Sequence, residues 1–277
     1  MLIVEKITNY NYSRFKGTFN SLPKKRQDEL KRSNDAHEDS KRMLLDYISR
    51  NNLTYNLISD DMVTASIVDK NHIIISLGGD GTFLKTSQYV LNQYILGINS
   101  DPENSRGFLA SCNKDSFHKS LDSLFNKSPE LEYVFRLGAS VNGVELRNRA
   151  LNEIIVGNPH IGKTSRFNIS YNSHKGSVVG NGILVSTAKG SHAFYKNAGG
   201  KPFSKASLGL VNLLSLEEKG TISFPSVIDY VDFITLVPKQ CNYKILFDSG
   251  STGEVSIHQG DEVKIYLDKK NPLKVLK

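Results

Sequence analysis

The chain has 277 residues with a formal net charge of +7; 39% of the residues are hydrophobic and 23% are charged. This composition is typical of a globular protein, and the length favours two domains over one hydrophobic core. No apolar run approaches the length of a membrane span, and charge follows the start too soon for a secretion signal, so we expect neither a membrane protein nor a secreted one. The two cysteines, Cys112 and Cys241, suggest no disulfide framework, which favours a cytoplasmic location.

The positive charges are scattered along the sequence. Their one dense group, residues 24–26 with Lys31 and Arg32, is interrupted by Asp28 and Glu29. Proteins that bind nucleic acid usually concentrate their cations on one face, so we expect no nucleic-acid partner. The excess charge instead favours anionic small molecules as ligands.

The first part of the sequence alternates between short apolar runs and amphipathic ones. We predict strands at residues 2–4, 55–59, 72–77 and 94–99, and helices at residues 35–51 and about 83–91. Strands that alternate with helices form parallel sheets covered by helices. Residues 1–105 are therefore expected to form a Rossmann-like α/β domain, whose ligands bind beyond the carboxyl ends of the strands.

The second part is dominated by short strand-like runs separated by turn signals such as Asn142-Gly143. One helical interval is expected at about residues 203–216. We predict that residues 106–258 form a mostly β domain, as a layered sheet or sandwich, and that residues 259–277 return to the first domain. The predicted strands are residues 132–137, 141–147, 153–156, 167–171, 183–186, 222–224, 233–237, 242–247 and 263–266.

The most informative motif lies in residues 72–84. A β-branched run ends at the Gly-Gly-Asp-Gly of residues 78–81, and a helix-compatible stretch follows. Glycines at such a turn let a phosphate approach the first backbone N–H groups of the helix. A carboxylate would repel phosphate, so Asp80 is expected to handle a hydroxyl proton or a metal, as in a kinase. On the motif alone, an ordinary strand-to-helix turn remains the alternative.

Three further segments have patterns that suit a nucleotide site. The loop at residues 97–109 leaves a predicted strand and either joins the domains or contacts a ligand. Asn152 and Glu153 precede a strand; an amide and a carboxylate can bind a base edge or ribose hydroxyls, although turn formation is the simpler explanation. Residues 180–194 combine hydroxyls, a histidine and an aromatic ring, which suits an adenosine pocket, although each residue alone is unremarkable in a core or on a surface.

The order and spacing of these blocks over residues 70–250 resemble the NAD kinase family. The chain matches the family pattern at residues 78–82, 97–99, 107–109, 152–153, 186–187, 190–191, 193 and 198–200, and Asp248 lies where the family has an aspartate near its end. Residues 99–105 and 150–153 resemble the mitochondrial-type branch of the family. The resemblance implies transfer of the terminal phosphoryl group of ATP to the 2′-hydroxyl of the adenosine ribose of NAD, which yields NADP.

The resemblance also implies roles for individual residues. Asp80 is expected to accept the proton of the ribose hydroxyl, and a divalent cation such as Mg²⁺ to neutralise the donor's charge, with no protein ligand to the metal assigned. The expected phosphate-binding residues are Gly78, Gly79, Gly81 and Thr82, and the expected NAD-binding residues are Asn152, Glu153, Asn181, Thr187, Ser191, His192, Ala193 and Phe194. A homodimer or homotetramer is expected.

The chain departs from the family pattern in the adenosine segment. Asn181 replaces an aspartate, His192 a threonine and Phe194 a tyrosine, and residues 188–189 replace Pro-Thr. These departures keep open a non-catalytic NAD(H)-binding or regulatory protein on the same fold. A lipid kinase with the same glycine turn is a second alternative, against which an adenosine pocket argues. The sequence does not distinguish between ATP and polyphosphate as the phosphoryl donor, or between NAD and NADH as the phosphoryl acceptor.

Overall fold

The computed structural model of the chain divides into two compact units. Unit 1 comprises Met1–Val134 and Leu273–Lys277, and unit 2 comprises Phe135–Pro272. The structure describes residues 1–160, 162–204, 206–219, 221–223, 226–229, 232–240, 242–248, 250 and 254–277, so Cys241 and the last residue of the predicted strand 222–224 lie outside it. Unit 1 thus extends beyond the expected boundary at residue 105. The segment that returns to it is Leu273–Lys277, which is shorter than the expected residues 259–277.

Unit 1 contains a sheet with the strand order β2–β1–β3–β4–β17. Its elements are β1 (Leu2–Glu5), α1 (Asn9–Phe15), the 3₁₀ helix η1 (Phe19–Ser21), α2 (Lys24–Arg50), β2 (Asn56–Ser59), α3 (Ala65–Val68), β3 (Ile73–Gly78), α4 (Asp80–Ser87), β4 (Tyr94–Asn99), β5 (Cys112–Asn113), α5 (Phe117–Phe125) and the end of β17 (Val263–Leu276). The pairings of β1 with β2 and β3, and of β4 with β3, β5 and β17, are parallel. The carboxyl ends of β1 and β3 therefore meet at one edge.

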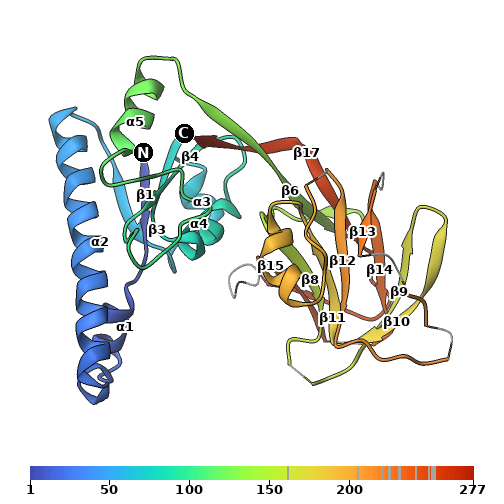
Figure 1. Ribbon diagram of the computed structural model, residues 1–277. Coiled ribbons are helices and arrows are strands. Elements are labelled where there is room, and N and C mark those ends of the chain that lie inside the picture. The colour runs from blue at the N-terminus through green and yellow to red at the C-terminus, as the bar shows by residue number, and fades with distance from the viewer. Residues whose placement is uncertain are drawn as a thin grey trace. The chain divides into compact units, whose positions relative to one another are not determined.

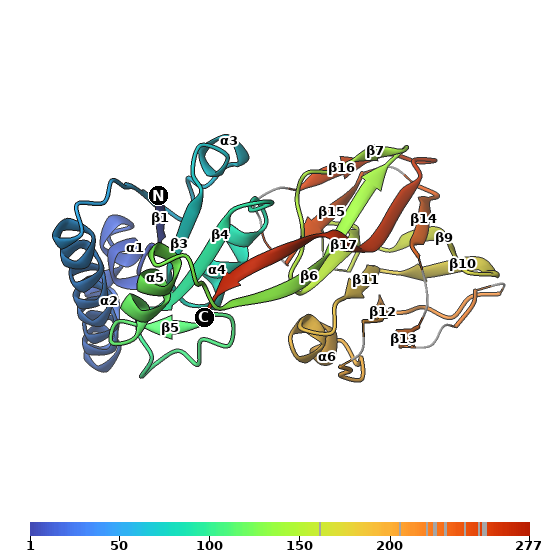
Figure 2. The same ribbon diagram turned by 90° about the horizontal axis from the view of Figure 1, so that it is seen from above.

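Helices cover both faces of this sheet, with α2 on one side of the strands and α4 on the other in Figures 1 and 2. Helix α2 contributes Leu44 and Ile48 to a core that also contains Ile3 and Ile75. Helix α5 adds Phe117 to the same core, which explains why unit 1 extends past residue 105. The predicted Rossmann-like α/β domain is confirmed.

The helix predicted at residues 35–51 is confirmed and begins earlier, at Lys24. Pro23 precedes its first turn, where the missing N–H of proline removes no helical hydrogen bond. The helix ends before Asn52, which adopts a left-handed conformation with φ of 52°. Of the helix residues before position 35, only Leu30 is buried. The apolar pattern in the sequence therefore predicts only the second part of the helix.

Unit 2 is mostly β and contains two layers of strands. Its elements are β6 (Leu131–Val141), β7 (Val144–Glu145), β8 (Glu153–Gly157), β9 (Ser165–Tyr171), β10 (His174–Gly180), β11 (Gly182–Ser186), the 3₁₀ helix η2 (Gly190–His192), α6 (Phe194–Asn197), β12 (Leu208–Leu213), β13 (Val227–Ile228), β14 (Ile234–Pro238), β15 (Tyr243–Phe247), β16 (Val255–Ile257) and most of β17. One antiparallel sheet has the order β13–β12–β11–β8–β15–β16, and the other layer contains β10–β9–β14–β17 with β6 and β7. Strands β6 and β17 each continue from one unit into the other.

The two layers of unit 2 share one hydrophobic core. Its buried residues include Ile154 and Val185 from the first sheet, and Phe167, Leu236 and Ile265 from the second layer. Alternate residues of β9 are buried, as expected for a strand with one face on a core. The layered β domain that the sequence predicts is confirmed.

The helix predicted at about residues 203–216 is wrong. Residues 208–213 form β12, which pairs with β11 along most of its length and with β13 at its start. The apolar residues of this segment fit both the 3.6-residue period of a helix and the two-residue period of a strand. Pairing with neighbouring strands supplies the partners that its backbone N–H and C=O groups need. The short helices η2 and α6 lie earlier in the chain, before residue 198.

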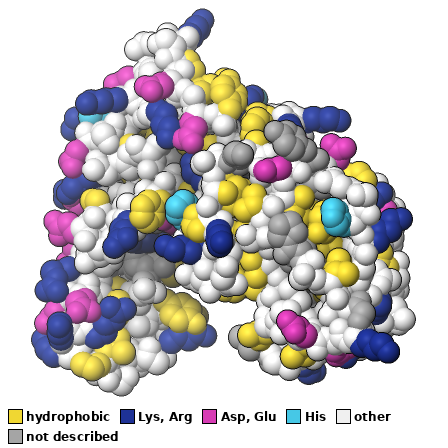
Figure 3. All heavy atoms as spheres, turned by 45° about the vertical axis from the view of Figure 1, so that its right-hand side comes forward, with side chains coloured by type: hydrophobic (Ala, Val, Ile, Leu, Met, Phe, Trp, Pro, Cys, Tyr) yellow, Lys and Arg dark blue, Asp and Glu magenta, His cyan; other side chains and the backbone are white. Residues whose placement is uncertain are grey.

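The drawn face of the molecule carries side chains of mixed charge. On the face drawn in Figure 3, Lys and Arg side chains lie among acidic and hydrophobic ones, so this face has no extended cationic patch. Among helices in the described ranges, none combines the length and the apolar character that crossing a bilayer requires.

Candidate functional site

The glycine turn lies between β3 and α4 in unit 1. Strand β3 ends at Gly78, Gly79 precedes the helix, and α4 begins at Asp80. The first N–H groups of a helix have no partner within the helix, and the positive end of the helix dipole lies there. The turn therefore presents main-chain donors that can bind an anion.

The glycines of this turn differ in the space around them. A Cβ at Gly78 would lie 2.5 Å from Oγ1 of Thr82 and 3.1 Å from Cβ of Lys6. The place of a Cβ at Gly81 has no other heavy atom within 4 Å. The fold itself thus requires Gly78, whereas the open space beside Gly81 leaves room for a ligand.

The loop that follows β4 holds the side chain of Asp80. The N–H of Leu109 donates to Oδ1 at 2.8 Å, and the N–H of Phe108 donates to Oδ2 at 3.2 Å. Asn99 shapes this loop, because its Nδ2 donates to the carbonyl oxygen of Ser105 at 2.9 Å. The structure thus brings residues 78–82 and 97–109 together, and each oxygen of the carboxylate keeps a lone pair for a further donor.

The hydroxyl of Thr82 is used inside unit 1. Its Oγ1 donates to Oδ2 of Asp60 at 3.2 Å, and Nζ of Lys85 lies 3.2 Å from Oδ1 of the same carboxylate. Thr82 is buried. Any contact of Thr82 with a phosphate therefore comes from its backbone N–H.

Lys6 is a residue at the turn that the sequence analysis did not identify. It follows β1 directly, and its N–H donates to the carbonyl oxygen of Leu77 at 3.0 Å, so it lies beside the end of β3. Burial lowers the pKa of its ammonium group, although the carboxylate of Asp101 acts in the opposite direction. A signal for it existed: a basic residue at the carboxyl end of a strand parallel to β3 lies at the edge where the turn lies.

In unit 2, the residues before β8 form a tightly held turn at positions 151–153. The N–H of Thr187 donates to the carbonyl oxygen of Asn152 at 2.9 Å, and Oγ1 of Thr187 donates to that of Leu151 at 2.7 Å. Oγ of Ser186 lies 3.2 Å from the carbonyl oxygen of Asn152. A Cβ at Gly190 would lie 2.2 Å from that oxygen, so only glycine fits there.

Asp248 contacts the same turn through its carboxylate. The N–H groups of Leu151, Asn152 and Glu153 donate to it at 3.0, 2.6 and 3.3 Å. Burial raises the pKa of Asp248 to about 7, and the negative charge of Glu153 also raises it. The hydrogen bonds from the backbone N–H groups lower the pKa. The sequence analysis noted Asp248 only as a match to the family pattern and gave it no role.

The segment after β11 continues this cluster. Ser191 is fully buried, and its Oγ donates to the carbonyl oxygen of Ala188 at 2.7 Å and accepts the N–H of Phe203 at 3.1 Å. His192 is exposed and Ala193 partly so. Phe194 is 41% exposed, whereas the next residue of α6, Tyr195, is fully buried. Of these two neighbouring rings, Phe194 is therefore the one that a ligand can reach.

Asn181 lies apart from the other predicted NAD-binding residues. It precedes β11, whereas Thr187 follows that strand, so the two are about 20 Å apart along an extended chain. Its Nδ2 donates to the carbonyl oxygens of His160 and Lys163 at 3.1 and 2.9 Å. The structure thus brings residues 152–153 and 186–190 together, and residues 191–194 follow directly in the chain. It leaves Asn181 at the opposite end of the strand.

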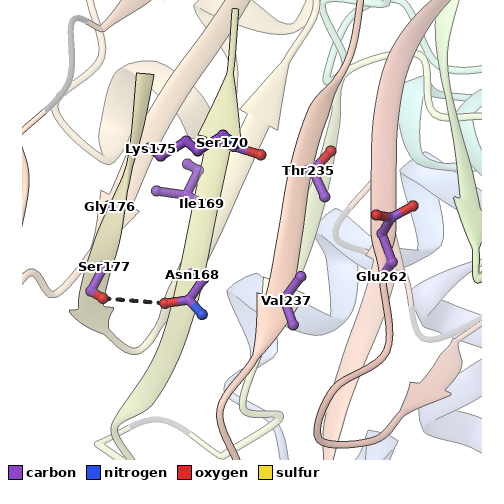
Figure 4. A pocket seen from close by; sticks show the side chains of 9 residues that line it. All are labelled: Asn168, Ile169, Ser170, Lys175, Gly176, Ser177, Thr235, Val237 and Glu262. Carbon is purple, nitrogen blue, oxygen red and sulfur yellow. Dashed lines mark hydrogen bonds between the residues drawn. The ribbon is translucent and has the colours of Figure 1, made fainter. Parts of the chain in front are cut away.

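A separate pocket of about 440 Å³ lies in unit 2 on β9, β10, β14 and the start of β17. Figure 4 shows side chains that line it, among which Oγ of Ser177 donates to Oδ1 of Asn168 at 3.2 Å. Its charged lining residues are Lys175 and Glu262. No predicted site residue lines this pocket.

Comparison with known proteins adds sequence relatives, although no family model matches the chain. A probable NADH kinase of Oryza sativa is 27% identical over 187 residues, which are 60% of this chain and 57% of that protein. The NAD kinase of Lawsonia intracellularis is 29% identical over 68% of this chain and 67% of its own. That of Chlorobium limicola is 34% identical over 50% of this chain and 49% of its own. The matches thus span about half to two thirds of these relatives.

Solved structures match over nearly the whole chain. An NAD kinase from Archaeoglobus fulgidus in complex with ATP has a TM-score of 0.67 and 19% identity, and the match covers 100% of this chain and 93% of that one. Yeast NADH kinase complexed with NADH has a TM-score of 0.66 and 15% identity, with 99% and 82% covered. The chain therefore has the two-unit fold of the NAD kinases. The chain is thus similar to NAD kinases in sequence over part of its length, and in fold over nearly all of it.

The different surroundings of the turn glycines predict different effects of added methyl groups. Gly78→Ala should lower the free energy of unfolding by about 1–3 kcal/mol, because its Cβ overlaps Thr82. Gly81→Ala, which places a methyl group in open space within a helix, should leave stability unchanged or raise it by up to about 1 kcal/mol. Urea unfolding of both variants measures the difference, and equal midpoints would contradict the assigned packing.

Proposed function

We propose that the protein is an NAD kinase, which transfers the terminal phosphoryl group of ATP to the 2′-hydroxyl of the adenosine ribose of NAD. The observation that carries the proposal is the turn at residues 78–82, where a fixed carboxylate adjoins the N-terminus of α4. The Lawsonia and Chlorobium relatives, which are named NAD kinases, support the substrates. The proposed product is NADP.

Unit 1 supplies the groups that bind the donor. The backbone N–H groups at Gly79, Gly81 and Thr82 hold phosphate oxygens, and the tight approach at Gly78 sets the shape of the turn. We assign Lys6 to the same phosphates, because a half-buried ammonium beside the turn carries a charge that a phosphate would neutralise. These groups stabilise the charge of the transferred phosphoryl group.

Asp80 is proposed to accept the proton of the ribose hydroxyl. The hydrogen bonds from Phe108 and Leu109 fix the carboxylate, so it does not need to be ordered when the substrate binds. A general base in such a position typically contributes about 10²–10⁴-fold to the rate. The hydroxyl oxygen then attacks the terminal phosphorus of ATP, the bond from this phosphorus to the bridging oxygen breaks, and ADP leaves.

A divalent cation such as Mg²⁺ is the proposed cofactor and would neutralise the donor's phosphates. Within the described residues, no group of three or more His, Cys, Asp or Glu side chains is placed to hold a metal ion. Proteins often bind Mg²⁺ through substrate phosphates, waters and one or two carboxylates. Asp80 is the carboxylate at the turn, and its open lone pairs suit either a metal-bound water or the hydroxyl.

Unit 2 supplies the groups that bind NAD. The partly exposed Asn152 presents its amide to the adenosine, and Phe194 offers its ring face to the base. We assign Glu153, whose side chain is only 2% exposed, to the same site behind Asn152. Ala193 and the exposed His192 border the same segment. The hydroxyls of Thr187 and Ser191 already bond inside unit 2, so we assign them the support of this surface. Asn181 retains its proposed role only at a more distant part of NAD.

We further propose a homodimer or homotetramer in the cytoplasm, which the resemblance to the NAD kinase family supports. Light scattering after size-exclusion chromatography measures the mass of the assembly. A mass equal to the 30.9 kDa of one chain would contradict the proposed assembly.

The decisive experiment incubates the purified full chain with NAD, ATP and Mg²⁺ and measures NADP. Parallel reactions with polyphosphate as donor and with NADH as acceptor identify the preferred substrates. NADP formation supports the proposal. Binding of NAD without NADP from any donor would contradict it and favour the non-catalytic NAD(H)-binding alternative.

Asp80→Asn should lower kcat by about 10²–10⁴-fold, because the amide cannot accept the hydroxyl proton. The KM for NAD should change little, since the variant keeps the shape of the side chain. Asp61→Asn, at an exposed aspartate of unit 1, is the matched control and should retain full activity. Steady-state kinetics of both variants measure the effect, and near-normal turnover of Asp80→Asn would exclude the proton-acceptor role.

Phe194→Ala should raise the KM for NAD about three- to tenfold, because it removes the ring that is proposed to stack on the base. The kcat should change much less, since Phe194 does not touch the reacting atoms. Phe15→Ala, which removes an aromatic ring that is 84% exposed in α1, is the control. An unchanged KM in the Phe194 variant would remove this residue from the adenosine pocket.

A further inference from the structure

The turn at residues 151–153 is held on two sides by different elements. Residues 186–187 hold its carbonyl oxygens, as described above, and Asp248 holds its N–H groups. In return, the N–H of Asp248 donates to the carbonyl oxygen of Glu153 at 2.8 Å. A short run of main chain that carries two proposed NAD contacts is thus fixed by a residue about a hundred positions later in the sequence.

We propose that Asp248 is a positioning residue, which holds the turn at residues 151–153 in the shape that lets Asn152 and Glu153 bind the adenosine part of NAD. The inference rests on the proposed function and deepens it. Asp248 acts through the turn, so it does not touch the substrate.

The side chain and the backbone at this position both favour aspartate. Asp248 has φ of 52°, in the left-handed region that Asp and Asn tolerate better than other side chains. Its carboxylate supplies acceptors on two oxygens, Oδ2 for Leu151 and Oδ1 for Asn152 and Glu153. Asparagine would keep the backbone conformation but would turn an N–H₂ group toward one of these donors.

The charges around Asp248 make its hydrogen bonds to the turn at residues 151–153 sensitive to pH. Glu153 from β8 repels its negative charge, and the buried Arg136 from β6 attracts it. Because burial raises the pKa of Asp248 to about 7, the carboxylate gains a proton as the pH falls from 8 to 6. A protonated carboxyl forms weaker hydrogen bonds to N–H groups than a carboxylate does. The turn should therefore loosen at the acidic end of this range.

The test compares Asp248→Asn with wild type in the full chain. The variant should raise both the Kd and the KM for NAD about ten- to hundredfold, because charge-assisted hydrogen bonds to the turn are lost. The kcat at saturating NAD should fall less than the KM rises. Asp261→Asn is the matched control: Asp261 is in unit 2 and also accepts a backbone N–H, from His258 at 2.7 Å, but it does not contact the turn.

Two further measurements distinguish positioning from a general loss of structure. Amide hydrogen exchange at residues 151–153 should be faster in Asp248→Asn, while exchange in β3 and β4 stays as in wild type. In the wild type, the KM for NAD should rise several-fold from pH 8 to pH 6, and this rise should be absent in the variant. If the variant fails to fold, the protection factors of residues 151–153 in the wild type, which correct for the intrinsic effect of pH on exchange, should fall from pH 8 to pH 6 and still test the contact.

Three results would overturn the inference. An unchanged protection factor at residues 151–153 in the variant, or in the wild type between pH 8 and 6, would show that Asp248 does not hold the turn. Faster exchange with an unchanged KM for NAD in an active enzyme would show that the turn does not position the substrate. Wild-type protein that neither forms NADP nor binds NAD would overturn the proposed function, and the role in NAD binding with it.

Discussion

The turn at residues 78–82 in unit 1 and the turn at residues 151–153 in unit 2 each depend on main-chain atoms that approach their neighbours without an intervening side chain. Gly78 lies against Thr82 in unit 1, and Gly190 lies against the backbone of Asn152 in unit 2. At such distances a methyl group would overlap its neighbours, so these positions require glycine. Because no side chain lies between these atoms, hydrogen bonds to the main chain determine the conformation of each turn. Side chains on the turns, such as those of Asp80 and Asn152, are then free to serve a substrate.

Two aspartates accept N–H groups at these turns, and their burial separates their roles. Asp80 is partly exposed, so a substrate can reach it, whereas Asp248 is buried and its carboxylate already accepts three backbone N–H groups. The folded-state pKa of Asp248, about 7, lies above the ordinary value of 3.8. Its contribution to stability is therefore complete at acidic pH and is lost as the pH rises through 7. The ionised form that best holds the turn is thus the form that the fold tolerates less well.

The sequence predicts local features of the site well, because β3, the glycine turn and α4 follow one another along the chain. The carboxylate of Asp80 meets the N–H groups of residues 108 and 109, and that contact was not predictable, since no periodicity links them. Asp248 and its partners are still farther apart in sequence. The strand β12 was mistaken for a helix for a similar reason: its backbone partners lie in β11 and β13, outside the segment itself.

The last strand has a consequence for how the protein is made. Residues 274 and 275 of β17 pair with residues 94 and 95 of β4, so the sheet of unit 1 includes residues that the ribosome adds after all of unit 2. Strands β1 to β4 emerge early, but their sheet lacks the end of β17 until translation has passed residue 275. Residues 94 and 95 of β4 therefore lack this partner throughout the synthesis of unit 2, whereas residues 98 and 99 can already pair with β5. Exposed strand edges of this kind invite pairing with other chains.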